Sequence, residues 1–276
     1  FLAISGIILP MLPHKNLIPD INLTPYSIWL ATVVVSGISY LSYLLKRYVF
    51  HESGVLVSGI IGGLYSSTAT ISVLARKSRK ASAQEANEYV AAMLLAVSMM
   101  FLRFMILILI FSREIFMSIY PYLLIMSVVA AVVAWFIHSR QRRSKDLSAD
   151  SEEEDSSNPL EFKVALIFAT LFVIFTVLTH YTLVYAGTGG LNLLSFVSGL
   201  SDITPFILNL LQNTGSVAVL IVVACSMQAI ISNILVNMFY ALFFAGKGSK
   251  LRPWILGGFG TVIGVNLVLL LFFYFI

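Results

Sequence analysis

The chain has 276 residues, of which 59% are hydrophobic and 11% are charged, and its mean hydropathy is +0.93. A soluble chain of this length could not hide so much apolar surface in its core, so most of that surface must face lipid. The formal net charge of +4 lies almost wholly between the apolar stretches. It therefore indicates orientation and contact with lipid headgroups, and no nucleic-acid-binding signature accompanies it.

The apolar residues form long runs, each near the roughly 20 residues that a membrane-spanning helix needs. Residues 1–13 are interpreted as the end of an upstream membrane segment. Eight further segments follow, at 26–48, 54–75, 88–111, 115–137, 160–184, 189–211, 216–245 and 253–276. The predicted fold is an all-α integral membrane protein that crosses the bilayer several times.

Two proline-led starts divide these segments into two sets of four. Thr24-Pro25 and Asn158-Pro159 each place a capping residue before a proline at the first helical position, and Glu161 completes a capping box after Asn158. Residues 140–158 hold a basic cluster followed by an acidic one, which is typical of a flexible charged loop. We therefore predict repeat one at 22–139 and repeat two at 159–276.

A short block supports the repeat, because residues 63–68 (GLYSST) align with residues 199–204 (GLSDIT), 136 positions later. The two copies differ in loop charge: wherever one has Lys and Arg after a segment, the other has few or none. Since Lys and Arg accumulate on the cytoplasmic side, this pattern indicates inverted copies. Inversion needs an odd number of crossings, so each copy would hold one broken or re-entrant helix, at Gly62-Gly63 and at Gly199. Eight full crossings are the alternative.

Inverted repeats with interrupted helices are typical of transporters, whose sites lie near the bilayer midplane between the repeats. The interruptions carry Ser66, Ser67 and Thr68 in copy one, and Asp202 and Thr204 in copy two. These oxygen-bearing side chains suit a hard cation or a proton-coupled site, although no metal can be assigned. Close helix packing by small residues explains the hydroxyl groups equally well.

Two charges lie deep inside apolar runs, Arg103 and Asp202. An unpaired charge there costs at least about 2.5–3.5 kcal/mol, so we expect each to face protein, water or the other. We expect Asp202 to be buried and to act as the functional carboxylate, with Arg103 as its countercharge. A static Arg103–Asp202 ion pair that only holds the helices together is the alternative.

The remaining polar signals are weaker. Asn233 shares a helical face with Ser226 and Asn237, which could line a polar path or bond neighbouring helices. Small residues at 257, 260 and 264 indicate close packing of the last segment. The single cysteine excludes an internal disulfide and a cysteine-based zinc site. No catalytic set, phosphate loop or dinucleotide motif is present, so we expect neither an enzyme nor a cofactor.

The chain resembles the uncharacterised C-terminal multi-pass membrane domain found fused behind MgtC/SapB-type membrane domains. The resemblance covers nearly the whole chain and includes Arg103. It rests further on the stretches at 35–40 (VSGISY), 62–69 (GGLYSSTA), 158–163 (NPLEFK), 198–202 (SGLSD) and 232–233 (SN).

This resemblance implies a multi-pass protein of a prokaryotic inner membrane, with an upstream MgtC/SapB-like domain as a possible partner. It implies no substrate. The leading hypothesis is a transporter or channel for an inorganic ion or small solute, in contact with the lipid bilayer and able to form homo-oligomers. The alternative is a non-transporting membrane regulator or scaffold of the MgtC type.

Overall fold

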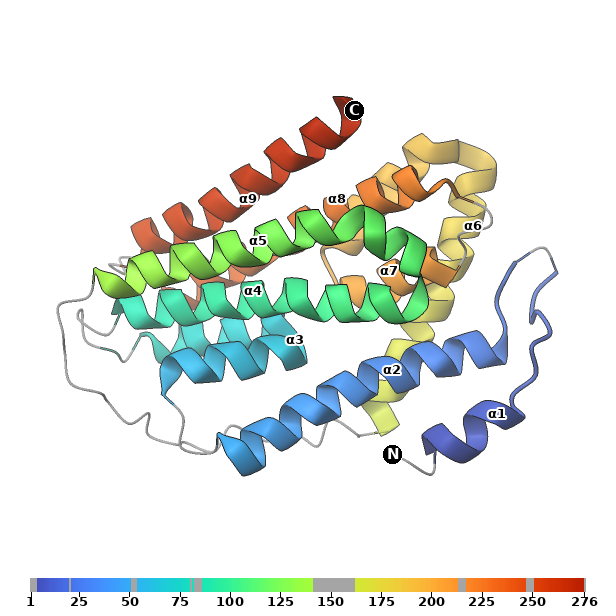
Figure 1. The fold of residues 1–276 in the computed structure, drawn as a ribbon, viewed down its shortest axis with the longest axis horizontal. Helices are drawn as coiled ribbons and strands as arrows, with labels where there is room; N and C mark the ends of the chain where they lie inside the picture. Colours follow the sequence, from blue (N-terminus) through green and yellow to red (C-terminus); the bar gives the residue numbers. More distant parts are fainter. Residues whose placement is uncertain are drawn as a thin grey trace. The chain divides into compact units, whose positions relative to one another are not determined.

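The structure is a computed structural model that describes residues 4–19, 21–50, 54–79, 81, 86–140, 162–212, 217–246 and 251–275. Every regular element in these ranges is a helix (Figure 1), and η marks a π-helical turn. The elements are η1 (Ile4–Ile8), α1 (Leu9–Met11), α2 (Pro25–Leu44), η2 (Leu45–Val49), α3 (Val55–Lys77), α4 (Ala86–Phe111), α5 (Arg113–Ser139), α6 (Phe162–Ser198), α7 (Ile203–Gln212), α8 (Val219–Ala245) and α9 (Arg252–Phe275).

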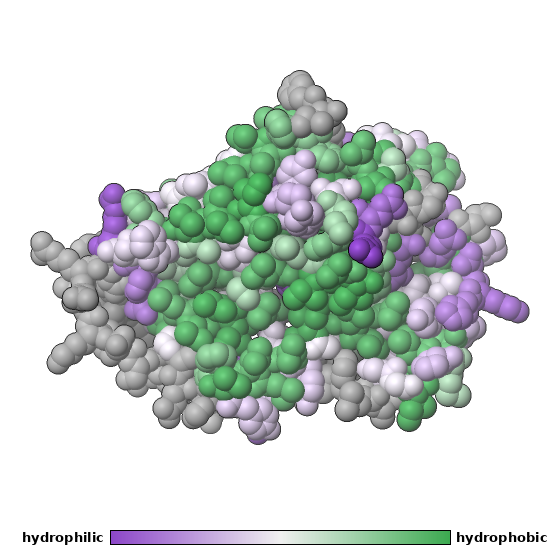
Figure 2. Space-filling view, in the orientation of Figure 1, coloured by the Kyte–Doolittle hydropathy of each residue, from purple (hydrophilic) through white to green (hydrophobic). Residues whose placement is uncertain are grey.

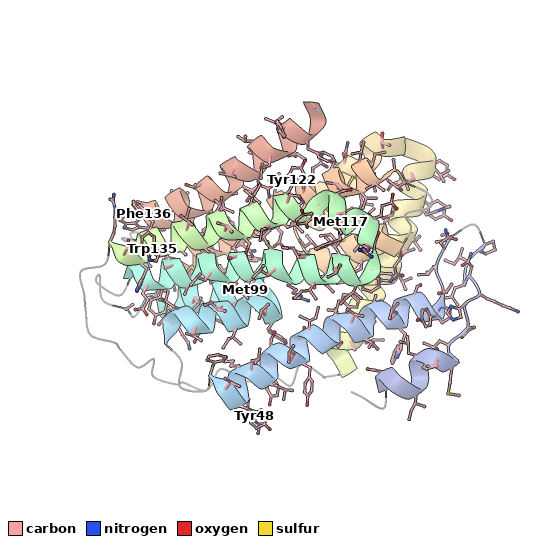
Figure 3. All side chains as sticks on the ribbon, in the orientation of Figure 1. Tyr48, Met99, Met117, Tyr122, Trp135 and Phe136 are labelled. Carbon is pink, nitrogen blue, oxygen red and sulfur yellow. The ribbon has the colours of Figure 1, made fainter. Side chains whose placement is uncertain are left out.

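The helices confirm a multi-pass membrane protein. Within the described ranges, seven are long and apolar enough to cross a bilayer, judged by length and composition. Large apolar side chains are exposed along them, and Figure 2 shows hydrophobic residues over much of the visible face. On α5, Trp135 is 69% exposed and Phe136 46%, and both side chains lie at the helix surface in Figure 3. Such surfaces are stable only in contact with lipid.

The start of α2 confirms the first predicted cap. The backbone N–H of Ser27 donates to Thr24 Oγ1 at 3.0 Å, and the N–H of Thr24 donates to Ser27 Oγ at 3.1 Å. Pro25 takes the first helical position, where no backbone donor is needed. The second predicted cap, from Asn158 to Glu161, and the charged loop after Arg140 lie outside the described residues.

The chain divides into two compact units, and each draws on both halves of the sequence. Unit 1 consists of Phe1–Tyr40, Ile106–Ile119 and Ser157–Asn233. Unit 2 consists of Leu41–Met105, Tyr120–Ser156 and Ile234–Ile276.

Helix α6 joins the fifth predicted segment to part of the sixth. The sequence predicts a loop at 185–190 between these segments, but helical hydrogen bonding continues from Phe162 to Ser198, and only Gly187 leaves helical geometry. Its φ of 59° and ψ of −152° turn the backbone without ending the helix, so the ribbon of α6 changes direction (Figure 1). The helix is instead interrupted further on, between Ser198 and Ile203.

Helix α7 has 10 residues and is too short to cross a bilayer. Its residues from Ile203 to Leu211 are all buried. Asn209 Nδ2 anchors it to α6 by donating to Thr179 Oγ1 at 2.8 Å and to the carbonyl of Phe175 at 3.3 Å. Protein contacts therefore stabilise α7 inside unit 1.

Gly187→Ala should destabilise the protein, because this combination of φ and ψ is accessible essentially only to glycine and costs other residues about 1–3 kcal/mol. The measurement is the thermal unfolding midpoint in detergent. Gly189→Ala is the matched control, since Gly189 is helical and a Cβ added there would meet nothing within 4 Å among the described residues. Equal midpoints for the two variants would contradict the assigned backbone turn.

Candidate functional site

Helix α3 is broken at Ser66 and folds back on itself. Ser66 has φ −158° and ψ 107°, and its Oγ accepts a hydrogen bond from the N–H of Ala69 at 3.3 Å. In a straight helix, Gly62 and Thr70 would stand about 12 Å apart along the axis. A Cβ on Gly62 would instead meet the Thr70 side chain, with Cγ2 at 2.8 Å. The two half-helices therefore lie side by side, as the α3 ribbon shows in Figure 1.

A second break separates α6 from α7. Turn hydrogen bonds close the end of α6, from the N–H of Leu200 to Val197 O and from the N–H of Ser201 to Ser198 O, both at 3.1 Å. Asp202 Oδ1 then accepts from the N–H of Thr204 at 2.9 Å and caps α7. Asp202 thus caps the helix after this break, as Ser66, 136 positions earlier, caps the helix after the first.

Each break packs on a later long helix through the same pairs of positions. In unit 2, a Cβ on Gly63 would lie 2.5 Å from Ala96 Cα. In unit 1, a Cβ on Gly199 would lie 2.6 Å from Ser232 Oγ. A second pair of contacts is also equivalent. In unit 2 Gly59 packs against the backbone of Ala92, and in unit 1 Ser195 Oγ donates a hydrogen bond to Gln228 Oε1. Each residue in unit 1 stands 136 positions after its counterpart in unit 2. The spacing found in the sequence therefore describes tertiary contacts as well.

Breaking a helix frees backbone carbonyl groups, and a buried side chain satisfies them in each unit. In unit 2, Arg103 Nη1 donates to Tyr65 O at 2.7 Å. In unit 1, Asn233 Nδ2 donates to Gly199 O at 3.3 Å and to Ser201 O at 3.4 Å. A cation beside the C-terminal end of a half-helix is also favourable for the helix dipole. Arg103 and Asn233 thus each donate hydrogen bonds to the carbonyl groups that one of the two breaks leaves free.

The predicted site residues differ in their access to solvent. Ser67 and Thr204 are buried, at 8% and 3% exposure, whereas Ser66 and Thr68 are half-buried. The prediction that Asp202 is buried is wrong, because its side chain is exposed. The cause is the position of the break: Asp202 stands at the start of a helix rather than inside one, and its side chain lies beside the helix end.

The structure brings the predicted residues together in two groups. Ser66, Ser67, Thr68 and Arg103 belong to unit 2, and Asp202, Thr204 and Asn233 belong to unit 1. Inside its own unit, Arg103 bonds to a backbone carbonyl, and Asp202 bonds to a backbone amide. The Arg103–Asp202 ion pair stays a prediction.

Sequence reasoning assigned no role at a helix break to Ser232 or Gln228, which contact the second break and the helix leading to it. Both could have been found by carrying the 136-residue spacing beyond the short block, onto the residues that pack against the first break. Ser232 is 1% exposed, and its Oγ has no hydrogen-bond partner among the described residues.

Basic side chains gather where α3 and α8 end in unit 2. The guanidinium of Arg76 lies over the Phe244 ring, 4.3 Å from its centroid. Arg79 Nε would lie 3.2 Å from a Cβ on Gly246, directly after α8. The ends of α3 and α8 are therefore neighbours at one end of unit 2.

Arg103→Met should lower the free energy of unfolding by about 1–3 kcal/mol, because it leaves a carbonyl freed by the break without its donor. The measurement is thermal unfolding in detergent. Ile106→Met is the control on the same helix, since Ile106 is 45% exposed and apolar. A change no larger than in the control would mean that Arg103 does not support the break.

Comparison with known proteins finds uncharacterised relatives. The family model described as "Domain of unknown function (DUF4010)" matches residues 33–245, which include both breaks and their packing partners. An uncharacterized protein of Aquifex aeolicus (strain VF5) is 26% identical over 220 residues, which cover 79% of this chain and 94% of that protein. No solved structure matches. The match over most of its length shows that this chain belongs to the DUF4010 family.

Proposed function

We propose that the protein is a membrane transporter or channel for an inorganic ion or small solute, and that polar groups at a helix break bind it. The observation that carries this proposal is the exposed side chain of Asp202 at a helix break, in a stretch (187–233) that has no other charged residue. A charge in contact with lipid costs at least about 2.5–3.5 kcal/mol at mid-membrane depth. Asp202 is therefore best accommodated where water or a polar substrate reaches it.

The backbone at both breaks supports the same function. Within a membrane, irregular backbone is tolerated only where protein buries it or where it lines a water-filled cavity. The breaks meet this condition partly through side-chain caps, and they also leave Ser66, Thr68 and Asp202 accessible. Discontinuous helices with such polar ends are the usual ion and substrate sites of transporters.

The number of membrane crossings supports inverted repeats. Because the ends of α3 and α8 are neighbours in unit 2, the chain between them crosses the bilayer an even number of times. Helix α4, helix α5, α6 before Gly187, and α8 make four crossings. The stretch at 188–212 must then return to its side of entry, as α3 does. Each copy would then have three membrane crossings and one re-entrant hairpin. Because three is an odd number of crossings, the second copy starts on the opposite side of the membrane and is inverted.

Position labelling in intact cells tests this topology after the native Cys225 is replaced by alanine. Ala81→Cys and Gly248→Cys should react on the cytoplasmic side, where the Lys and Arg residues accumulate, and Tyr185→Cys should react on the opposite side. Tyr185 is 82% exposed, so its access to reagent is not limited by packing. Labelling of Ala81→Cys and Tyr185→Cys from the same side would rule out inverted copies.

Asp202→Asn keeps the shape of the side chain and removes its charge. We expect this variant to remain folded and to lose cation- or proton-dependent flux in proteoliposomes, measured under imposed gradients of Na⁺, K⁺, H⁺ and Mg²⁺. Glu114→Gln is the control, because Glu114 is also exposed and acidic but lies at the start of α5. A folded Asp202→Asn protein with wild-type flux and ion dependence would refute the transport role of this carboxylate.

A regulator or scaffold of the MgtC type is the second candidate, and one surface favours it. Gly257, Gly260 and Gly264 are exposed on α9, and a Cβ on any of them would meet nothing within 4 Å among the described residues. We predicted that these glycines pack against neighbouring helices, so their partner on this reading is another copy or another membrane protein. An upstream MgtC/SapB-like domain and an inner-membrane location fit either function. Absence of flux in the wild-type protein would favour the regulator.

A further inference from the structure

Ser232 has a buried hydroxyl group to which the fold assigns no structural role. Its side chain lies on α8 and is 1% exposed, and Oγ has no hydrogen-bond partner among the described residues. Leaving a buried hydroxyl group unsatisfied costs about 1–3 kcal/mol. The hydroxyl group sits against Gly199, because a Cβ there would lie 2.6 Å from Oγ. Ser232 is therefore aimed at the break between α6 and α7.

The other copy shows that packing does not need this hydroxyl group. The counterpart of Ser232 is Ala96, which makes the same contact with Gly63. An alanine is sufficient to let the two helices approach at that position. The second break thus has a side-chain oxygen, that of Ser232, which the first break lacks and which packing does not require.

The charges around the two breaks also differ. The freed carbonyl at the first break is held by the cation of Arg103. At the second break a neutral donor, Asn233, holds the carbonyls of Gly199 and Ser201, and Asp202 adds a negative charge. No Lys, Arg or His occurs in residues 187–233, and Asp202 is the only acidic residue there. The second break therefore attracts cations.

We propose that this second break binds a small monovalent cation, sodium, as the coupling ion of the proposed transport. Ser232 Oγ and the carbonyl oxygens of Gly199 and Ser201 supply neutral oxygen ligands, since each carbonyl keeps a lone pair beside its bond to Asn233. Asp202 supplies the compensating charge. One carboxylate balances one positive charge, and Mg²⁺ gives up its water too reluctantly for a site of this kind. This assignment rests on the proposed function.

The test measures sodium binding without measuring transport. The purified full chain in detergent is titrated with NaCl against choline chloride at constant ionic strength, and the thermal unfolding midpoint is followed. Sodium should raise the midpoint of the wild-type protein, since a ligand that binds only the folded state stabilises it. Ser232→Ala should raise the half-maximal sodium concentration by roughly tenfold or more. Direct binding of ²²Na⁺ to the same proteins provides a second readout.

Ser226→Ala is the matched control on α8. Ser226 is equally buried, but its Oγ already donates to Val222 O at 2.7 Å, so this variant should keep the wild-type sodium response. Should Ser232→Ala fail to fold, the same titration on Asp202→Asn takes its place, and it should show no sodium response.

Stabilisation by choline as strong as by sodium, preference for K⁺ or Mg²⁺, or an unchanged sodium response in Ser232→Ala would each overturn the site. Sodium binding without any flux would keep the site and reject transport. Flux that is independent of sodium, in a protein that binds none, would reject the site and keep transport.

Discussion

Where a helix is interrupted inside a membrane, its backbone N–H and C=O groups lose their hydrogen-bond partners. The need to supply new partners for these groups underlies the rest of this structure. A helix that stops in the bilayer exposes amide and carbonyl groups that lipid cannot bond, at several kcal/mol for each group. The protein meets this requirement twice in the same manner. A side chain from the break caps the following helix, and a buried side chain from a later helix holds the freed carbonyls. Glycine at the contact lets the two backbones approach closely.

The same constraint explains how two similar breaks acquire different chemistry. The carbonyls at the first break are held by a cation, and those at the second by an amide. The helix after the first break is capped by a neutral hydroxyl, and the helix after the second by a carboxylate. Both solutions satisfy the backbone, so the scaffold is preserved while the local charge changes sign. The proposed functional asymmetry follows from this choice of capping residues.

Much of this could be predicted from sequence, because the controlling features are local or periodic. Composition predicts the membrane environment, and Thr24-Pro25 predicts the start of α2. The reversed loop charges and the glycines at 62–63 and 199 predict interrupted helices, and helices are interrupted at Ser66 and between Ser198 and Ile203. Other features depend on tertiary contacts between residues that are far apart in the sequence. Arg103 and Asn233 do comparable work from positions that the repeat spacing does not equate, so no periodicity could have identified their shared role.

Two errors have a common origin. The sequence predicts a new segment at 189, after a connection that follows 184, and it predicts that Asp202 is buried. Hydropathy averages over a window and does not detect where the chain turns. The turn at Gly187 depends on one glycine backbone conformation, and the break at 199–202 depends on packing against α8. Neither has a hydropathy signal of its own.

The central claim is that polar helix breaks reach water within a lipid-embedded chain. Cysteine accessibility tests it most directly, using Ser66→Cys and Ser201→Cys in a protein whose native Cys225 is replaced, with a charged, membrane-impermeant thiol reagent. Val132→Cys serves as the lipid-facing reference, since Val132 is 55% exposed on α5. Because the reagent attacks the thiolate, which forms in water and not in lipid, both break positions should react and the reference should not. Unreactive break positions in a folded protein would contradict the account.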